Sequence, residues 1–195
     1  MVRILIFSMF LCSAGWAPTA AGQQAWRIVP GRSIGYTSLG ETGDSMALTL
    51  GKPDGGDAAM GKAWAVYYNK NAAGQVRDSA RYLAVYLVRD EGSAGMRVRQ
   101  IRINTASFRA GNDIKVGASL QKIKAYYPGI LRAGIYQDTV THTRYYLYDA
   151  VQKGIAFEIN ANTNTCTAIT VHAPAQTVTS TYLSAPGYER MKQLQ

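Results

Sequence analysis

The feature that most constrains this chain is a short amphipathic stretch at residues 116–128. Ser119 can begin a helix there, because its hydroxyl can accept a hydrogen bond from an otherwise unpaired N–H of the first turn. Three apolar residues then recur at helical spacing and share one face: Leu120, Ile123 and Tyr127. The helix must end before Pro128, since proline cannot continue the hydrogen-bond ladder. The stretch therefore predicts a short helix that buries one face against the rest of the chain.

The same pattern occurs once earlier, at residues 39–51, and the two copies align at a constant offset of 77 residues. The matched pairs are Gly40 with Gly117, Thr42 with Ser119, Met46 with Ile123, and Leu50 with Tyr127. Runs typical of strands follow each copy. They are 64–68, 83–88 and 98–103 after the first copy, and 145–148, 155–159 and 167–171 after the second. We therefore predict an α+β fold of two tandem repeats, each a short helix followed by an antiparallel meander of three to four strands.

Residues 1–21 have the pattern of a secretory signal peptide that is cleaved after Ala21. Arg3 supplies the positive start, and the apolar run at 4–11 is too short to span a bilayer. The alternatives are a retained membrane anchor and a lipoprotein modified at Cys12, although Leu11 stands where a lipoprotein would have a small residue. We expect a periplasmic or secreted protein with no transmembrane segment after cleavage. The predicted organisation is a signal peptide (1–21), a first repeat (22–110), a second repeat (111–173) and a polar C-terminal tail (174–195).

A small residue, a Ser/Thr-capped helix ending near Gly or Pro, and an antiparallel meander all occur twice, and this pattern resembles the beta-lactamase inhibitory protein-like fold. Outer-membrane assembly lipoproteins of the BamE/SmpA type look like single-copy relatives. The resemblance covers residues 34–171 and implies a protein-binding role, either inhibitor-like or envelope-assembly-like. Those inhibitors are clamped by disulfides, whereas Cys166 is the one cysteine that remains here after cleavage. No functional residue is therefore carried over from the family.

The chain is basic, with a formal net charge of +9 that becomes +8 once Arg3 leaves with the signal peptide. A basic exported protein can meet an acidic protein, anionic lipid head groups or an anionic wall polymer, although charge alone can also serve solubility. We expect the partner to be another protein, an acidic one being the first candidate, with an anionic envelope surface as the alternative. Export and the lack of a dense basic run argue against nucleic acid.

No stretch of the sequence matches a cofactor or metal site. Residues 56–63 come close to the phosphate-binding motif G-x-x-x-x-G-K-[ST], but Ala63 replaces the hydroxyl that would hold Mg²⁺. The segment also precedes a predicted strand, whereas a phosphate loop must follow one, so we predict no nucleotide and no other cofactor. Several acids lie in predicted turns, at spacings that match no metal site: Asp54, Asp57, Asp90 and Glu91.

Cys166 and His172 would point to the same side of one strand, which suggests a thiol–imidazole dyad. Six residues of extended strand span roughly 20 Å, however, so the two side chains cannot meet. His142 could reach the thiol only from a loop, and nothing in the sequence places it there. We therefore predict a non-catalytic protein, with an envelope hydrolase as the alternative.

The chain has 13 tyrosines beside 4 phenylalanines, and tyrosine suits surfaces that are apolar but keep one polar end wet. Strand alternation suggests an outward sheet face with aromatic and basic residues that binds a partner protein. The predicted binding surface consists of Tyr146, Tyr148, Glu158 and His172, together with Arg99 and Arg102. The alternative is that the tyrosines cover sheet edges and a second small core. The sequence thus predicts an exported, non-catalytic protein-binding module.

Overall fold

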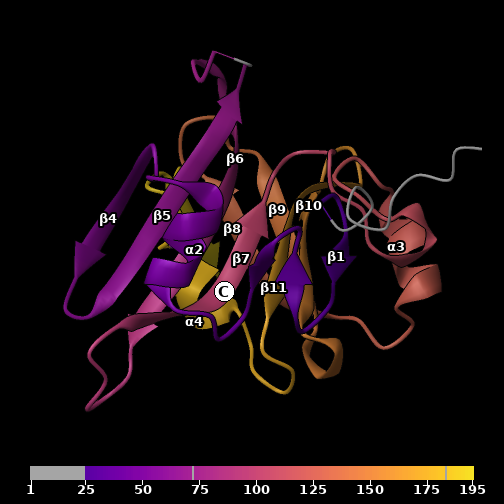
Figure 1. Cartoon of the computed structure of the whole chain (residues 1–195). Helices are drawn as coiled ribbons and strands as arrows, with labels where there is room; N and C mark the ends of the chain where they lie inside the picture. The colour runs from indigo at the N-terminus through magenta and orange to yellow at the C-terminus, as the bar shows by residue number, and fades with distance from the viewer. Residues whose placement is uncertain (1–24, 72, 183) are drawn as a thin grey trace, which may run out of the picture.

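The computed structural model describes residues 25–71, 73–182 and 184–195 (Figure 1). The predicted signal peptide and its cleavage site after Ala21 lie outside the described residues. Within the described ranges, no helix is both long enough and apolar enough to cross a membrane.

A nine-stranded antiparallel sheet forms the body of the molecule, in the order β12-β8-β9-β10-β11-β7-β6-β5-β4. Its strands are β4 (Gly55–Ala59), β5 (Lys62–Lys70), β6 (Val76–Arg89), β7 (Met96–Ile103), β8 (Leu131–Asp138), β9 (Arg144–Ala150), β10 (Ile155–Asn160), β11 (Thr165–His172) and β12 (Met191–Leu194). A small three-stranded sheet precedes them, made of β1 (Ile28–Val29), β2 (Ser33–Ile34) and β3 (Thr37–Ser38). The helical elements are α2 (Gly43–Leu50), η1 (Gly111–Asp113), α3 (Leu120–Tyr126), η2 (Val151–Lys153) and α4 (Thr179–Tyr182).

The two predicted helices form where the sequence places them. The Ser119 side chain caps α3 by accepting a hydrogen bond from the Lys122 N–H at 3.2 Å, and Thr42 caps α2 in the same way. Each helix buries one apolar residue fully or nearly so, Met46 in α2 and Ile123 in α3. Both helices are short and are held mainly by that buried face, since isolated helices of this length are marginal in water.

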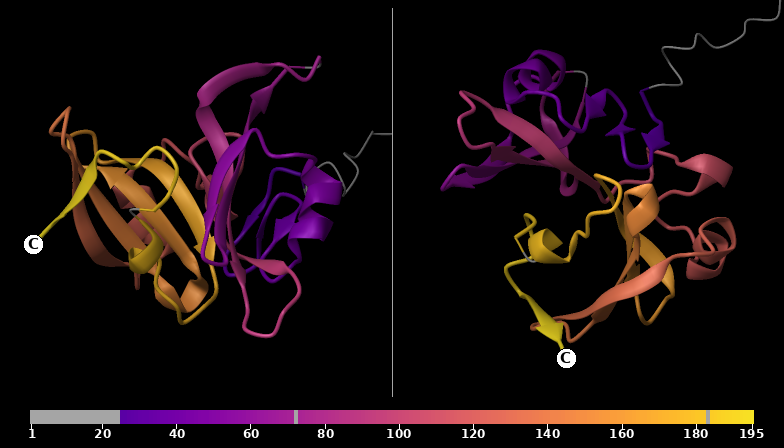
Figure 2. Two further views of the ribbon diagram at one scale, coloured as in Figure 1. Left: turned by 90° about the vertical axis from the view of Figure 1, so that its left-hand side faces the viewer. Right: turned by 90° about the horizontal axis from the view of Figure 1, so that it is seen from below.

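The large sheet is covered on both faces. One face, here called the helix face, carries α2 and α3 and holds the larger apolar cluster, which includes the fully buried Phe157 and Ile159. The other, here called the tail face, is covered by the C-terminal segment, residues 174–194, which passes through α4 over this face before it ends in β12 at the edge of the same sheet (Figure 2). Two smaller apolar clusters lie beneath this segment, around Trp64 and around Tyr136.

The prediction of an α+β fold built from two tandem helix-plus-meander repeats is wrong. Strands dominate the described chain, and the nine strands β4 to β12 form one continuous sheet rather than two repeat units. The sheet is continuous because β7 pairs with β11, which sets Ile103 opposite Ile169 and Ile101 opposite Val171. These apolar pairs lie inside the helix-face core, so burial of apolar surface favours a single sheet.

Both edges of the large sheet lie outside the runs from which strands were predicted. One edge is β4, and the other is β12, which lies within the predicted polar tail (174–195). Glycine, alanine and aspartate have low strand propensity, so the pairing of β4 with β5 decides its conformation. The strand β8 also lies outside those predicted runs.

Candidate binding cleft

A buried ion pair holds the C-terminal segment on the tail face. The guanidinium of Arg102 lies 2.9 Å from the carboxylate of Glu158, and both side chains are almost completely buried. Glu158 also accepts hydrogen bonds from the hydroxyls of Tyr182 and Tyr188, both of which belong to the C-terminal segment. We call Arg102, Glu158, Tyr182 and Tyr188 the tail clamp. Because Arg102 and Glu158 come from central strands of the sheet, the clamp fixes the segment over the middle of the tail face.

Electrostatics keep the clamp charged. Burial raises the pKa of Glu158, but the charge of Arg102 and hydrogen bonds from Thr167, Tyr182 and Tyr188 outweigh it, so the net shift of that pKa is downward. A buried charge without such partners would be strongly disfavoured. The clamp therefore depends on all of its partners being present together.

A second polar contact anchors the start of the C-terminal segment. His172 Nε2 lies 3.0 Å from Asp149 Oδ1, and the other carboxylate oxygen of Asp149 accepts the Val178 N–H at 3.4 Å. His172 Nδ1 lies 3.0 Å from the carbonyl oxygen of Ala173, which can only accept. Both ring nitrogens therefore lie within hydrogen-bond distance of acceptor oxygens. Both imidazole nitrogens are therefore engaged in holding the chain.

Beside the clamp, aromatic residues of β5 and β6 form the floor of a cleft. Trp64 and Tyr86 are directly paired across the two strands, and their ring centroids are 5.0 Å apart. The next pairs on the same face are Val66 with Ala84 and Tyr68 with Tyr82. The alternation of these strands puts every second residue on the tail face, as the period of a β-strand requires.

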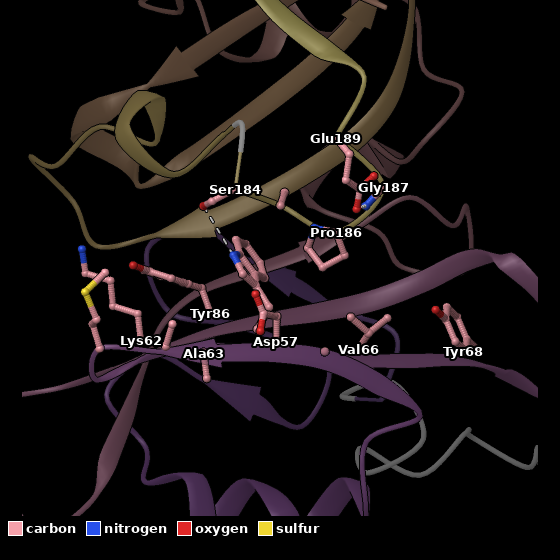
Figure 3. A pocket seen from close by; sticks show the side chains of 15 residues that line it. Asp57, Lys62, Ala63, Val66, Tyr68, Tyr86, Ser184, Pro186, Gly187 and Glu189 are labelled. Carbon is pink, nitrogen blue, oxygen red and sulfur yellow. Dashed lines mark hydrogen bonds between the residues drawn. The ribbon is translucent and has the colours of Figure 1, made fainter.

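The wall of the cleft is the C-terminal segment at residues 184–189 (Figure 3). Two hydrogen bonds tie this wall to the floor: Trp64 Nε1 donates to Ser184 Oγ at 3.4 Å, and the Tyr82 hydroxyl donates to the carbonyl of Pro186 at 3.1 Å. The cleft has a volume of about 710 Å³. Its charged lining residues are Asp57, Lys62 and Glu189. The arrangement offers an aromatic floor with carboxylates and an ammonium group around it.

The strand β4 forms one side of the cleft and is also an edge of the large sheet. It joins β5 through a turn in which Met60 (φ 49°) and Gly61 (φ 74°) both have positive φ, as a type I′ hairpin requires. Gly56 cannot be replaced easily, because a Cβ there would overlap the carbonyl oxygen of Trp64. The Ala58 N–H bonds to the side chain of Asp57 at 2.8 Å instead of to β5. The main chain at Ala58 and Gly56 therefore faces away from the sheet.

The residues predicted as a binding surface divide between the two faces. Tyr146 and Tyr148 lie on the helix face, whereas Arg102, Glu158 and His172 lie buried on the tail face. The strand register explains this, since Tyr148 is opposite the core residue Phe157 and Leu147 is opposite Glu158. The exposed Arg99 pairs separately with Asp90. The structure brings Arg102 and Glu158 together, but it does not present the set as one exposed surface, and its role in binding stays a prediction.

On the helix face, each of the two tyrosines has a cation above its ring. Lys124 Nζ lies 5.1 Å from the ring centroid of Tyr148, and the Arg132 guanidinium lies 5.3 Å from that of Tyr146. Tyr148 itself is buried. With these contacts, the two tyrosine side chains pack over the helix-face core.

Cys166 and His172 lie on opposite faces of the sheet. A bulge between Glu158 and Ile159 shifts the register, so Cys166 faces Ile159 in the helix-face core. Its thiol donates to the Ala168 carbonyl at 3.3 Å, and burial raises its pKa, which suppresses the reactive thiolate. The dyad considered for the envelope hydrolase is therefore not assembled. Among the described residues, no group of three or more histidine, cysteine or acidic side chains could hold a metal ion.

Sequence reasoning did not assign the cleft. The alternation at 63–69 places Trp64, Val66 and Tyr68 on one face, which was a usable signal for its floor. The wall at 184–189 had no signal, because its residues are small or polar and are placed by contacts with strands about a hundred residues earlier, as the Trp64–Ser184 bond shows.

Comparisons with known proteins give distant likenesses only. No family model matches the chain, and no curated protein matches it. One similar solved structure is an extracellular protein containing an SCP domain from Bacillus anthracis str. Ames, with a TM-score of 0.45, 11% identity, and coverage of 98% of this chain and 55% of that one. Another is a cysteine-rich secretory protein from Staphylococcus aureus subsp. aureus Mu50, with a TM-score of 0.43, 12% identity, and coverage of 77% and 48%.

This chain thus spans about half the length of these two proteins. At such scores neither likeness carries an argument about what the chain does. The resemblance to the beta-lactamase inhibitory protein-like and BamE/SmpA-type folds is wrong, because it depended on a tandem repeat, and β4 to β12 form one continuous sheet in the described residues instead.

Proposed function

We propose that this chain is an exported, non-catalytic binding module that receives an extended segment of another protein in the cleft above Trp64. One arrangement carries the proposal: the aromatic cleft and the free edge of β4 adjoin each other. Export is proposed from the N-terminal sequence pattern. The cleft supplies contacts to the partner, and no residue in it is given a catalytic role.

An extended peptide can add to an exposed sheet edge through main-chain hydrogen bonds. The outward main chain at Gly56 and Ala58 offers such an edge once the Ala58 N–H exchanges its exposed hydrogen bond with the Asp57 side chain for one with the peptide, and β4 there is largely exposed. A peptide paired with β4 would turn every second side chain toward the tail face. Those side chains would enter the cleft, where Trp64 and Tyr86 suit apolar or aromatic groups. The expected ligand is therefore an extended segment with apolar residues at alternate positions.

The edge can be tested without disturbing the sheet. Ala58→Pro removes an N–H that β5 does not use, and proline is tolerated at such outward positions of edge strands. Ala58→Thr changes the side chain at the same position but keeps the N–H, so it is the matched control. Thermal melting of both variants shows whether the fold is kept.

The probe is a random dodecapeptide library displayed on phage and selected on the protein without its signal peptide. We expect enriched peptides with alternating apolar residues, which bind wild type and Ala58→Thr alike. Ala58→Pro should bind them about tenfold more weakly, since the hydrogen bond from the N–H of residue 58 is lost. No enrichment over a support without protein would overturn the proposal, as would peptides that bind Ala58→Pro as tightly as wild type.

A further inference from the structure

A second hollow is lined by residues of β1 and of the end of α3. These two elements lie to the right in Figure 1, away from β4 and β5. The volume of the hollow is about 450 Å³. The cationic residues that line it are Arg27, Arg109 and Lys153. Of the described residues that line the hollow, none has a carboxylate, and the remaining polar side chains are the tyrosines Tyr126 and Tyr127.

The backbone forces these cations together. Arg27 and Arg109 are directly paired in a parallel bridge, held by the Ile28 N–H to the Arg109 carbonyl at 2.7 Å and by the Arg109 N–H to the Trp26 carbonyl at 2.8 Å. Lys153 is brought in by the next residue, because the carbonyl of Gly154 accepts the Gly31 N–H at 3.0 Å. Their proximity is therefore fixed by main-chain contacts and not by the flexible side chains.

The local charge is poorly balanced. Asp113 pairs with Arg109 at 3.1 Å and lies 3.7 Å from Lys115, so one carboxylate serves two cations. In the described part of the chain, neither Arg27 nor Lys153 has an ion-pair partner. Because Arg27 and Arg109 are directly bridged, their like charges repel each other. A bound anion would offset this repulsion.

We propose that this hollow is a binding site for a phosphate group, either free or as a phosphodiester. The ligand must offer hydrogen-bond acceptors, because guanidinium and ammonium groups only donate. Arginine matches phosphate oxygens with two parallel N–H bonds, and lysine adds a point charge. The apolar side of the hollow, formed by Ile28, Val29 and Pro30, leaves room for an uncharged part of a larger ligand. This site shares no residue with the cleft, so it does not depend on the proposed function.

The test compares two double variants with the same net charge. Arg27→Gln with Lys153→Gln removes two cations of the hollow, while Lys52→Gln with Arg77→Gln removes two exposed cations that do not line it. Inorganic phosphate is titrated by calorimetry. Vesicles of phosphatidylglycerol, with phosphatidylcholine as the blank, are tested by co-sedimentation. Thermal melting confirms that both variants fold.

We expect binding in at least one arm, weakened about tenfold or more by the hollow variant and within about twofold of wild type for the control. Binding of inorganic phosphate identifies a free phosphate as sufficient, whereas binding confined to phosphatidylglycerol vesicles identifies a lipid headgroup. Equal losses in the two variants would overturn the site, because net charge alone would then explain the binding. Absence of binding in both arms would overturn it too.

Discussion

Phe157 and Glu158 are neighbours in β10, yet they lie on opposite faces of the sheet and are stabilised in different ways. Phe157 is fully buried on the helix face and packs against Tyr127, with ring centroids 5.3 Å apart. Glu158 is also buried, but its surroundings on the tail face are Arg102 and hydroxyl groups. The helix face is thus held mainly by apolar contact, whereas on the tail face the matched polar groups of the clamp add to two smaller apolar clusters.

The difference shows what covers each face. An apolar face can pack against any element of suitable shape, and short helices are sufficient. A buried polar face is stable only when its specific partners are in place, because an unsatisfied buried group is costly. The C-terminal segment supplies those partners through Tyr182 and Tyr188. The tail face is therefore stable only when the C-terminal segment covers it, and that segment in turn forms the wall of the cleft.

The largest expected effect distinguishes the two faces by whether a second substitution restores the lost unfolding free energy. Phe157→Ala should cost about 3–5 kcal/mol of unfolding free energy, as large core truncations do. Glu158→Gln keeps acceptor oxygen for the hydroxyls but leaves Arg102 buried without a counter-charge, and it should also cost about 3–5 kcal/mol. Adding Arg102→Met to Glu158→Gln should restore part of that loss, because it removes the unpaired charge. Urea unfolding measures all of these variants.

The same variants give a dependence on pH. The folded pKa of Glu158 is lowered, so its contribution to stability is present above its unfolded pKa of about 4.3 and is lost as the pH falls through the folded pKa. The difference in unfolding free energy between wild type and Glu158→Gln should therefore become smaller as the pH is lowered. Two outcomes would show that the charge of the clamp is unimportant. One is a difference in unfolding free energy that stays unchanged down to low pH, and the other is a double variant that is no more stable than Glu158→Gln.

Sequence reasoning succeeded where the signal is local. Ser119 and Thr42 cap the predicted helices, and the alternation around Trp64 marks one strand face correctly. Sequence reasoning failed where contacts between distant parts of the chain decide on which face of the sheet a side chain lies. A bulge at Glu158 reverses the side on which Cys166 lies, and the pairing of β9 with β10 moves Tyr148 to the face opposite Glu158. Neither the bulge nor the register can be derived from the alternation of a single strand.

A smaller effect tests the tail face at a stacked pair of tyrosines. Tyr136 and Tyr182 have ring centroids 4.0 Å apart, but their hydroxyls differ. The Tyr182 hydroxyl donates to Glu158, whereas the Tyr136 hydroxyl is buried with no hydrogen-bond partner in the described part of the chain. Tyr182→Phe should cost about 2 kcal/mol, since it removes a hydrogen bond to a charged group. Tyr136→Phe is the matched control and should be neutral or slightly stabilising.

Chemical denaturation gives the two stabilities, and hydrogen exchange locates the change. Amides of the C-terminal segment should exchange faster in Tyr182→Phe and not in Tyr136→Phe, because that segment depends on the clamp. Equal losses of unfolding free energy in the two variants would mean that ring packing, and not the hydroxyl, holds the tail face. The two faces would then not differ in how they are stabilised.

The smallest effect concerns the helix face at one of the few places where a single hydrogen bond matters to it. Ser119→Ala removes the acceptor of the Lys122 N–H at the start of α3 and should cost about 1 kcal/mol in urea unfolding. Ser119→Asn keeps a capping oxygen and should stay close to wild type. The loss of unfolding free energy should be smaller than that of Tyr182→Phe. The N–H at the exposed helix end can form a hydrogen bond with water instead, whereas the buried carboxylate of Glu158 cannot. A Ser119→Ala variant as destabilised as Tyr182→Phe would show that the helix face also depends on specific polar partners.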